Sequence, residues 1–272
     1  MKKIFLIFTV INLVVNIKIL YAQTMNNNWE IYEEAMRYEN EGNFEKALGL
    51  YQKFYESSEG SAAKITALKA IAQLYKKIKK YDEAIEIYKK CLEFTLPPQH
   101  ILIIKTNMAG CYINQGKPLL GIKIYDEIIE EYSKTEYKTE IAGEAQFYKA
   151  NAYHRLIKDY EKAISEYEKM IKEYPEHWSV KTPYSLQSIA SCYYESKKYD
   201  DTIKVFEKII KNYPNTPFEK YAKLCIEIIN EYDKKGKTVP PEIIMKKMKE
   251  MGLGEGILNV EIKDGKVATE IK

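Results

Sequence analysis

Two short patterns recur five times along the chain, and this repetition constrains the fold more than any other feature of the sequence. The first is Ala-x-x-Tyr, at Ala35/Tyr38, Ala72/Tyr75, Ala109/Tyr112, Ala150/Tyr153 and Ala190/Tyr193. The second places apolar or small residues at i, i+3, i+7 and i+10, starting from Phe44, Tyr81, Pro118, Tyr160 and Tyr199. Both spacings are helical, so each copy predicts two amphipathic helices.

The gap between the two helices of a copy leaves room only for a tight turn. The second pattern begins six residues after the Tyr of the first in four copies, and seven residues after it in the fourth. Turn-forming residues occupy this gap, as in Gly42-Asn43. The helices of a copy are therefore expected to be antiparallel neighbours. A single pair cannot bury its apolar face, so the sequence predicts an all-α solenoid of about five stacked pairs over residues 28–232, closed by a capping helix near Phe218–Tyr232.

These patterns resemble the tetratricopeptide repeat (TPR) family, whose signature combines a small residue and Tyr in the first helix with Ala and an aromatic residue in the second. The resemblance implies a right-handed superhelix whose concave surface is lined by the first helices. Gly121 and Thr202 stand where the second-helix Ala is expected, and the copies are spaced by 37, 37, 42 and 39 residues. The longer connectors, with Tyr-Pro endings at Pro175 and Pro214, are similar to those of exported bacterial members that act in the periplasm or in outer-membrane assembly.

The first 22 residues have the pattern of a signal peptide. A basic start at Lys2 and Lys3 precedes an apolar run over residues 4–15, and the small residue Ala22 suits the position before a cleavage site. We therefore expect residues 1–22 to direct export to the periplasm or cell envelope, with no membrane span in the mature chain. An uncleaved N-terminal anchor is the alternative.

The composition argues against nucleic-acid binding. The full chain has a formal net charge of +3, but residues 1–22 contain three Lys and no acidic residue, so the mature chain is neutral. A protein that binds nucleic acid relies on an excess of Lys and Arg to neutralise phosphates. We therefore expect no nucleic-acid partner.

Residues 233–272 lose the repeat. Pro240-Pro241 can start a short helix, expected over roughly Glu242–Met251. Beyond it, strand-like residues on both sides of Asp264-Gly265 predict a β-hairpin tail.

No catalytic or metal-binding pattern was found. His100, His154 and His177 lie in separate copies, and no two His have a metal-binding spacing. There is no Gly-rich phosphate loop and no nucleophile elbow. We therefore expect no catalytic residues, no metal and no cofactor, and hence a protein that is not an enzyme. Cys91 and Cys111 lie on consecutive helices and are the one pair that we expect to be able to form a disulfide; buried free thiols are the alternative.

The resemblance also implies which residues face the groove of the solenoid, beside the Ala-x-x-Tyr core. Those positions are Trp29, Tyr32, Met36, Lys69, Gln73, Lys76, Asn107, Asn114, Phe147, Asn151, His154, Arg155, Tyr184, Gln187 and Tyr194. The surface is aromatic at both ends and basic in the second and fourth copies. His154 is expected to face the groove, either in partner contact or as an ordinary surface residue.

Some TPR proteins clamp a C-terminal carboxylate, but the residues here do not support this. Lys69 and Asn107 match such a clamp, whereas Gln73 replaces an Asn, and Glu144 and Tyr148 stand where a basic pair is needed. The expectation is therefore an exported scaffold that binds an extended or helical segment of a protein partner, for assembly of an envelope or periplasmic complex. The alternative is a permanent structural or accessory subunit of a larger enzyme complex.

Overall fold

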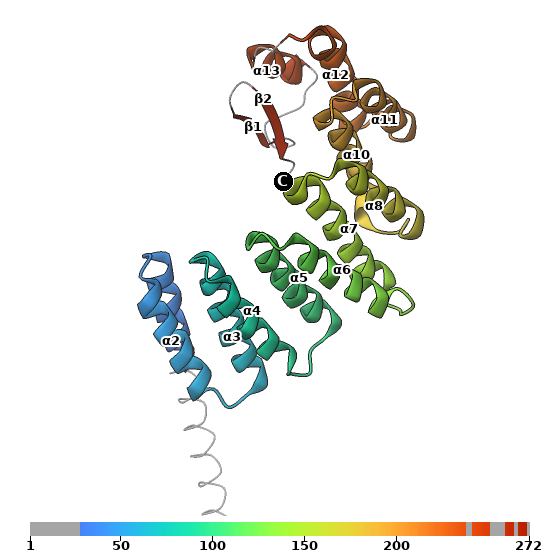
Figure 1. Ribbon diagram of the computed structural model, residues 1–272. Helices are drawn as coiled ribbons and strands as arrows, with labels where there is room; N and C mark the ends of the chain where they lie inside the picture. The colour runs from blue at the N-terminus through green and yellow to red at the C-terminus, as the bar shows by residue number, and fades with distance from the viewer. Residues whose placement is uncertain (1–27, 238–240, 251–258, 264–265, 271–272) are drawn as a thin grey trace, which may run out of the picture. The chain divides into compact units, whose positions relative to one another are not determined.

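The computed structural model describes residues 28–237, 241–250, 259–263 and 266–270, and these are mostly helical (Figure 1). The residues of the expected signal peptide lie outside this range. The paired helices are residues 28–40 with α2 (Phe44–Ser57), α3 (Ser61–Lys77) with α4 (Tyr81–Leu92), α5 (Pro98–Asn114) with α6 (Pro118–Tyr132), a composite helix with α8 (Tyr160–Glu173), and α10 (Tyr184–Glu195) with α11 (Tyr199–Asn212). The expected five pairs are thus confirmed.

The chain divides into two compact units, with the boundary between Ile124 and Tyr125. This boundary falls inside α6, so a single continuous helix contributes residues to both units. The first unit contains the first two pairs and α5 together with the start of α6, and the second unit contains the remaining pairs and the C-terminal elements.

The first helix of the fourth pair is a composite of three segments. α7 (Glu144–Asn151) is flanked by the π-helical segments η1 (Lys138–Gly143) and η2 (Ala152–Ile157). A π-helical turn accommodates one residue more than an α-helical turn, because its hydrogen bonds run from i to i+5. The fourth copy is also the one with seven rather than six residues between the two patterns. The wider turn of η2 absorbs this extra residue, and Tyr160 still begins α8 as the pattern predicts.

Every turn between the two helices of a pair contains a residue in the left-handed conformation. It is Gly in two copies, Gly42 (φ +79°) and Gly116 (φ +76°), and Lys in the other three. The three lysines are Lys79 (φ 62°), Lys158 (φ 60°) and Lys197 (φ 59°). A left-handed residue commonly ends a helix, and Gly adopts this conformation without strain. In the other three copies, the turn therefore forms although Lys is less favourable than Gly in the left-handed conformation.

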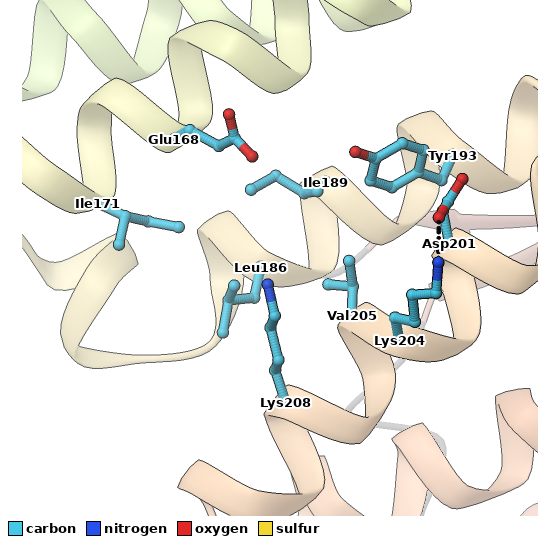
Figure 2. Close-up of a pocket in the computed structure, with 9 residues that line it drawn as sticks. All are labelled: Glu168, Ile171, Leu186, Ile189, Tyr193, Asp201, Lys204, Val205 and Lys208. Atoms are coloured by element: carbon cyan, nitrogen blue, oxygen red, sulfur yellow. Dashed lines mark hydrogen bonds and ion pairs between the residues drawn. The ribbon is translucent and has the colours of Figure 1, made fainter.

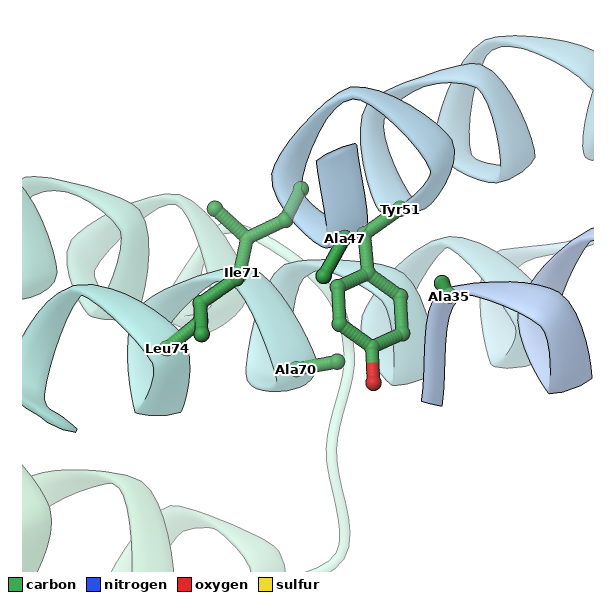
Figure 3. Close-up of a cluster of buried hydrophobic side chains, with 6 residues drawn as sticks. All are labelled: Ala35, Ala47, Tyr51, Ala70, Ile71 and Leu74. Carbon is green, nitrogen blue, oxygen red and sulfur yellow. The ribbon is translucent and has the colours of Figure 1, made fainter. Parts of the chain in front are cut away.

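The repeated small residues allow the helices to approach one another. In the first unit, Ala35, Ala47 and Ala70 surround the ring of Tyr51, which is 1% exposed (Figure 3). Ala35 comes from the first helix, Ala47 from α2 and Ala70 from α3, so this cluster joins the first pair to the second. Burial of such apolar surface is the main favourable term in the stability of each unit.

The aromatic residue at i+7 of each second helix is buried in all five copies. These residues are Tyr51, Tyr88, Tyr125, Tyr167 and Phe206. The hydroxyl groups of three of the tyrosines differ in environment. Tyr51 donates to Glu39 (2.9 Å) and Tyr167 donates to Asn151 (2.9 Å), whereas the hydroxyl of Tyr88 has no hydrogen-bond partner among the described residues.

Two departures from the repeated second-helix pattern have a local explanation. A Cβ at Gly121 would lie 2.7 Å from Cγ1 of Ile113 and 2.8 Å from the carbonyl oxygen of Ala109, so even Ala is too large there. Thr202 is fully buried, and its hydroxyl donates to the carbonyl oxygen of Lys198 (3.0 Å), which satisfies the only polar group that it adds to the core.

The C-terminal part contains the expected elements. α12 (Pro217–Glu231) caps the last pair, and η3 (Asp233–Lys235) follows it. α13 (Pro241–Glu250) matches the expected short helix, and its Lys247 forms an ion pair with Glu227 of α12. β1 (Asn259–Lys263) and β2 (Lys266–Glu270) pair antiparallel in a hairpin, with Lys263 opposite Lys266.

The four cysteines are free thiols. Cys91, Cys111 and Cys192 are buried and Cys225 is half-buried, so the Cys91–Cys111 disulfide is not formed. Burial raises the pKa of the Cys91 thiol to about 11, which keeps it protonated and unreactive at neutral pH. In the part of the chain that the structure describes, no helix has the length and apolar character needed to cross a membrane.

Candidate partner-binding surfaces

The residues expected to face the groove differ widely in exposure. Six are exposed: Trp29, Met36, Gln73, Asn114, Arg155 and Tyr194. Seven are half-buried: Tyr32, Lys69, Lys76, Asn107, Asn151, Tyr184 and Gln187. Phe147 and His154 are buried. Neither buried side chain presents the surface that partner contact requires, and both act inside the fold.

The first pair carries a small aromatic surface in the first unit. Trp29 packs against Phe54 of α2, with 5.1 Å between ring centroids, and against Tyr32 at 5.6 Å. Tyr32 also packs on Tyr51 (5.3 Å), so its ring is largely used within the pair. Met36 remains 45% exposed. Trp29 and Met36 are therefore the surface that this pair offers.

A basic and amide contact joins the second and third pairs. Nζ of Lys76 donates to Oδ1 of Asn107 (3.1 Å), and Nδ2 of Asn107 donates to the carbonyl oxygen of Ile103 (3.0 Å). The structure thus brings these two predicted residues together. The amide of Asn107 is held in place from both ends.

In the second unit, the carboxylate of Glu144 organises a site that the sequence did not predict. Its Oε2 accepts hydrogen bonds from Nε2 of His177 (2.7 Å) and Nε1 of Trp178 (3.0 Å). Burial acts to raise the pKa of Glu144, but the hydrogen bonds from His177, Trp178 and Tyr148 outweigh it and hold the pKa below its usual value. Glu144 is therefore charged at neutral pH, and it is the residue that stands in place of a clamp cation.

His177 is held in one tautomer. The backbone N–H of Ser179 donates to its Nδ1 (3.3 Å), and this caps the short helix α9 (Trp178–Lys181). Because Nδ1 accepts a hydrogen bond, the ring proton is on Nε2, from which it is donated to Glu144. His177 is 3% exposed, and it connects α9 to the start of α7.

Trp178 lies at the surface on a base of aromatic rings. Phe147 packs edge-on against it at 5.1 Å between centroids, and Tyr184 does so at 5.3 Å. Phe147 is 6% exposed, whereas Trp178 is 46% exposed. Phe147 is thus the buried support of this cluster rather than its contact surface, which corrects the sequence-based expectation. Edge-to-face pairs of this kind stabilise beyond the area that they bury.

His154 also lies inside the fold, contrary to both interpretations of the sequence. It is 4% exposed, and its Nε2 lies 2.9 Å from Oε1 of Glu195 in α10. Tyr160 donates to the other oxygen of Glu195 (3.0 Å). This cluster ties η2 to the neighbouring pair and satisfies Nε2 of His154, whereas Nδ1 of the ring is buried without a partner among the described residues.

Lys149 of α7 is buried and pairs with two carboxylates. Nζ of Lys149 lies 2.8 Å from Oδ1 of Asp126 and 2.9 Å from Oε1 of Glu166. Gln146 donates to Oε2 of Glu166 (2.7 Å). Burial acts to lower the pKa of Lys149, but the two ion pairs outweigh it and the pKa is raised. Lys149 stays charged, and the network is structural.

Two predicted residues of α10 have different environments. Oε1 of Gln187 is buried and has no hydrogen-bond partner within the described part of the chain. Tyr194 packs against Tyr199 at 5.7 Å, and its hydroxyl hydrogen-bonds to Asp233 in η3. The carbonyl oxygen of the Gln187 side chain is thus enclosed in the fold and not accessible to a partner, whereas the hydroxyl of Tyr194 is occupied by its hydrogen bond to Asp233.

Comparison with known proteins identifies part of the repeat array. The tetratricopeptide repeat family matches residues 66–95 in one profile and residues 144–177 and 184–216 in another. These segments correspond to the second, fourth and fifth pairs. No curated protein matches the sequence significantly.

Several solved structures are similar to this chain at low sequence identity. The apo form of RapI aligns with a TM-score of 0.58 and 14% identity, covering 87% of this chain and 68% of RapI. A tetratricopeptide repeat protein from Parabacteroides merdae has a TM-score of 0.46 and 17% identity, over 83% and 84% of the two chains. YrrB, a TPR protein with an unusual peptide-binding site, has a TM-score of 0.40 and 17% identity, over 71% and 90%. The likeness to RapI supports the helical repeat fold.

Proposed function

Because the chain contains tetratricopeptide repeats, we propose that it is an interaction scaffold that binds a segment of a protein or peptide partner. The observation that carries this proposal is the exposed ring of Trp178. Its indole N–H is fixed by Glu144, and its ring rests on Phe147 and Tyr184. A preorganised aromatic side chain gives binding energy with little loss of conformational freedom.

The exposed aromatic surface suits a peptide. The exposed part of Trp178 can pack on an apolar side chain of the partner, and the half-buried ring of Tyr184 lies beside it. An aromatic anchor of this kind is typical of recognition of an extended or helical segment. We place the partner contact at Trp178 and Tyr184 in the second unit, with Trp29 and Met36 as a second contact area in the first unit.

We further propose that the protein acts in the periplasm or cell envelope of a bacterium, in the assembly of a complex there. The support is the signal-peptide pattern of residues 1–22. Cell fractionation followed by N-terminal sequencing of the purified chain tests this part. Recovery in the periplasmic fraction with Gln23 as the first residue is expected, and a cytoplasmic chain that keeps Met1 would contradict it.

The contact at Trp178 is tested by affinity capture from the native envelope with mass spectrometry. Trp178→Ala is expected to lose the proteins captured by the wild type, while its far-UV circular dichroism is unchanged because the side chain is half exposed. Leu119→Ala is the matched control, since Leu119 is 70% exposed and lies on the second helix of another pair. Equal capture by Trp178→Ala and the wild type would refute the site. A partner that stays bound at fixed stoichiometry through gel filtration would instead favour a permanent subunit.

A further inference from the structure

A hollow of about 370 Å³ opens between α8, α10 and α11 in the second unit (Figure 2). Its apolar floor is formed by Ile171, Leu186, Ile189, Tyr193 and Val205, and Glu168, Asp201, Lys204 and Lys208 surround the floor. Ligand pockets in proteins have volumes of about 300–1,000 Å³. The hollow is therefore large enough for one or two side chains but not for a folded domain.

The hollow lies on the side of α10 opposite to the proposed contact surface. Leu186, in its floor, follows Tyr184 by two residues, which is a rotation of about 200° around a helix axis. Leu186 and Tyr193 lie on the same side as Ile189, with i+3 and i+4 spacing between neighbours. A molecule bound in the hollow and a partner bound at Trp178 and Tyr184 therefore contact different faces of α10.

Two charges at the edge of the hollow are uncompensated. Asp201 and Lys204 pair with one another (2.9 Å), but Glu168 and Lys208 make no hydrogen bond or ion pair with other described residues. Figure 2 shows the ammonium group of Lys208 reaching from α11 toward the floor, and the carboxylate of Glu168 above it on α8. An apolar floor is thus flanked by one free cation and one free anion.

We propose that this hollow is a second partner site, which binds a peptide segment carrying a large aliphatic side chain beside a carboxylate. The aliphatic side chain fills the floor and loses its contact with water. The carboxylate pairs with Lys208, and a backbone N–H of the segment donates to Glu168. A fatty acid would supply the carboxylate for Lys208 but no hydrogen-bond donor for Glu168. A peptide supplies both the carboxylate and the donor.

The site can be tested by NMR on the purified chain with labelled isoleucine methyl groups, which reports directly on Ile171 and Ile189. The probe is the capped tetrapeptide acetyl-Gly-Leu-Glu-Gly-amide. Saturable shifts of both methyl groups are expected at millimolar peptide. Replacing the peptide Glu by Gln is expected to weaken binding about two- to fivefold, the range for an exposed ion pair. Replacing the peptide Leu by Ala is expected to abolish it.

The matched protein variants are Lys208→Met and Lys211→Met, both on α11. Lys208→Met is expected to weaken binding of the Glu-containing peptide about two- to fivefold, which equals the loss caused by the Glu-to-Gln replacement in the wild type. The affinity for the Gln-containing peptide is expected to stay unchanged in this variant, because both changes remove the same ion pair. Lys211 lies outside the hollow and its replacement is expected to change nothing. An unchanged spectrum on peptide addition, or equal effects of the two variants, would overturn the proposal. Octanoate that binds the hollow as well as the tetrapeptide does would overturn the choice of a peptide.

Discussion

Tyr88 gives a sharp test of how the repeat uses its buried tyrosines. It occupies the same position in α4 that Tyr51 occupies in α2 and Tyr167 in α8, and all three side chains are at most 1% exposed. The hydroxyls of Tyr51 and Tyr167 donate to a side-chain oxygen, at 2.9 Å in both cases, but that of Tyr88 has no partner among the described residues. Burial raises the pKa of Tyr88, as expected for a hydroxyl removed from water.

The change from Tyr to Phe removes only this hydroxyl. A buried polar group without a partner costs about 1–3 kcal/mol, so we expect Tyr88→Phe to raise the free energy of unfolding by about 1 kcal/mol. Tyr167→Phe removes a formed hydrogen bond and leaves Asn151 without its donor, so we expect a loss of about 0.5–1.5 kcal/mol. The two variants should therefore differ by about 2 kcal/mol, with opposite signs.

Urea denaturation followed by far-UV circular dichroism measures this difference. Midpoints should be compared at an unchanged slope, so that the shift reports stability alone. Tyr88→Ala is the control for burial, and we expect it to lose about 3 kcal/mol or more, as other emptied aromatic core positions do. If Tyr88→Phe loses as much stability as Tyr167→Phe, the hydroxyl has a partner in solution and the reasoning is wrong.

Three further predictions concern turns, packing and pH. Lys79→Gly is expected to raise the free energy of unfolding by about 0.5–1 kcal/mol. Gly removes the strain of a left-handed Lys, and this gain exceeds the free-energy cost of the extra conformational entropy that Gly gives to the unfolded chain. A urea midpoint at or below that of the wild type would refute this. Gly121→Ala should lower the unfolding free energy by about 1–3 kcal/mol through overpacking, whereas Gly49→Ala, in open space inside α2, should raise it by about 0.5–1 kcal/mol; equal urea shifts would contradict the close approach. The lowered pKa of Glu144 means that its stabilisation is present above the unfolded pKa of about 4.3 and is lost as the pH falls through the folded value. Thermal unfolding of Glu144→Gln should therefore vary less with pH than the wild type between about pH 5 and pH 3, and parallel curves would rule this out.

The helix pairs and their core could be predicted because both depend on local periodicity. A residue at i+7 returns to the same side of a helix, so the pattern that starts at Phe44 already indicates that Tyr51 is buried. The same logic holds in all five copies. Together, the two repeated patterns account for twelve of the 24 tyrosines in the chain as packing positions.

The site at Trp178 could not be predicted in this way. Trp178 lies in a connector between two pairs, outside both repeated patterns, and its contacts with Glu144 and Phe147 join residues more than thirty positions apart. Periodicity within a helix contains no information about such contacts. The sequence contains one signal for this site: Trp178 is one of the two Trp residues of the chain, and it lies in a connector that is longer than the repeat requires.

The burial of His154 could not be predicted for a different physical reason. The periodicity of an α-helix places His154 on the groove side, but the residue lies in the π-helical segment η2, where the turn is wider and successive side chains are rotated by a smaller angle. The side chain therefore points to Glu195 rather than to the groove. The one additional residue in the fourth copy was the visible sign of this change.

The π-helical segment η2 indicates how a helical repeat array can accept an inserted residue during evolution. One residue inserted into a straight α-helix would turn every later side chain by about 100° and misplace the apolar face of that helix. A local π-helical turn confines the disturbance to a few positions, and α8 still begins with Tyr160 and buries Tyr167. An insertion of this kind can thus be inherited without the loss of any neighbouring repeat. Unequal copy lengths in this chain are consistent with a fold that tolerates growth one residue at a time.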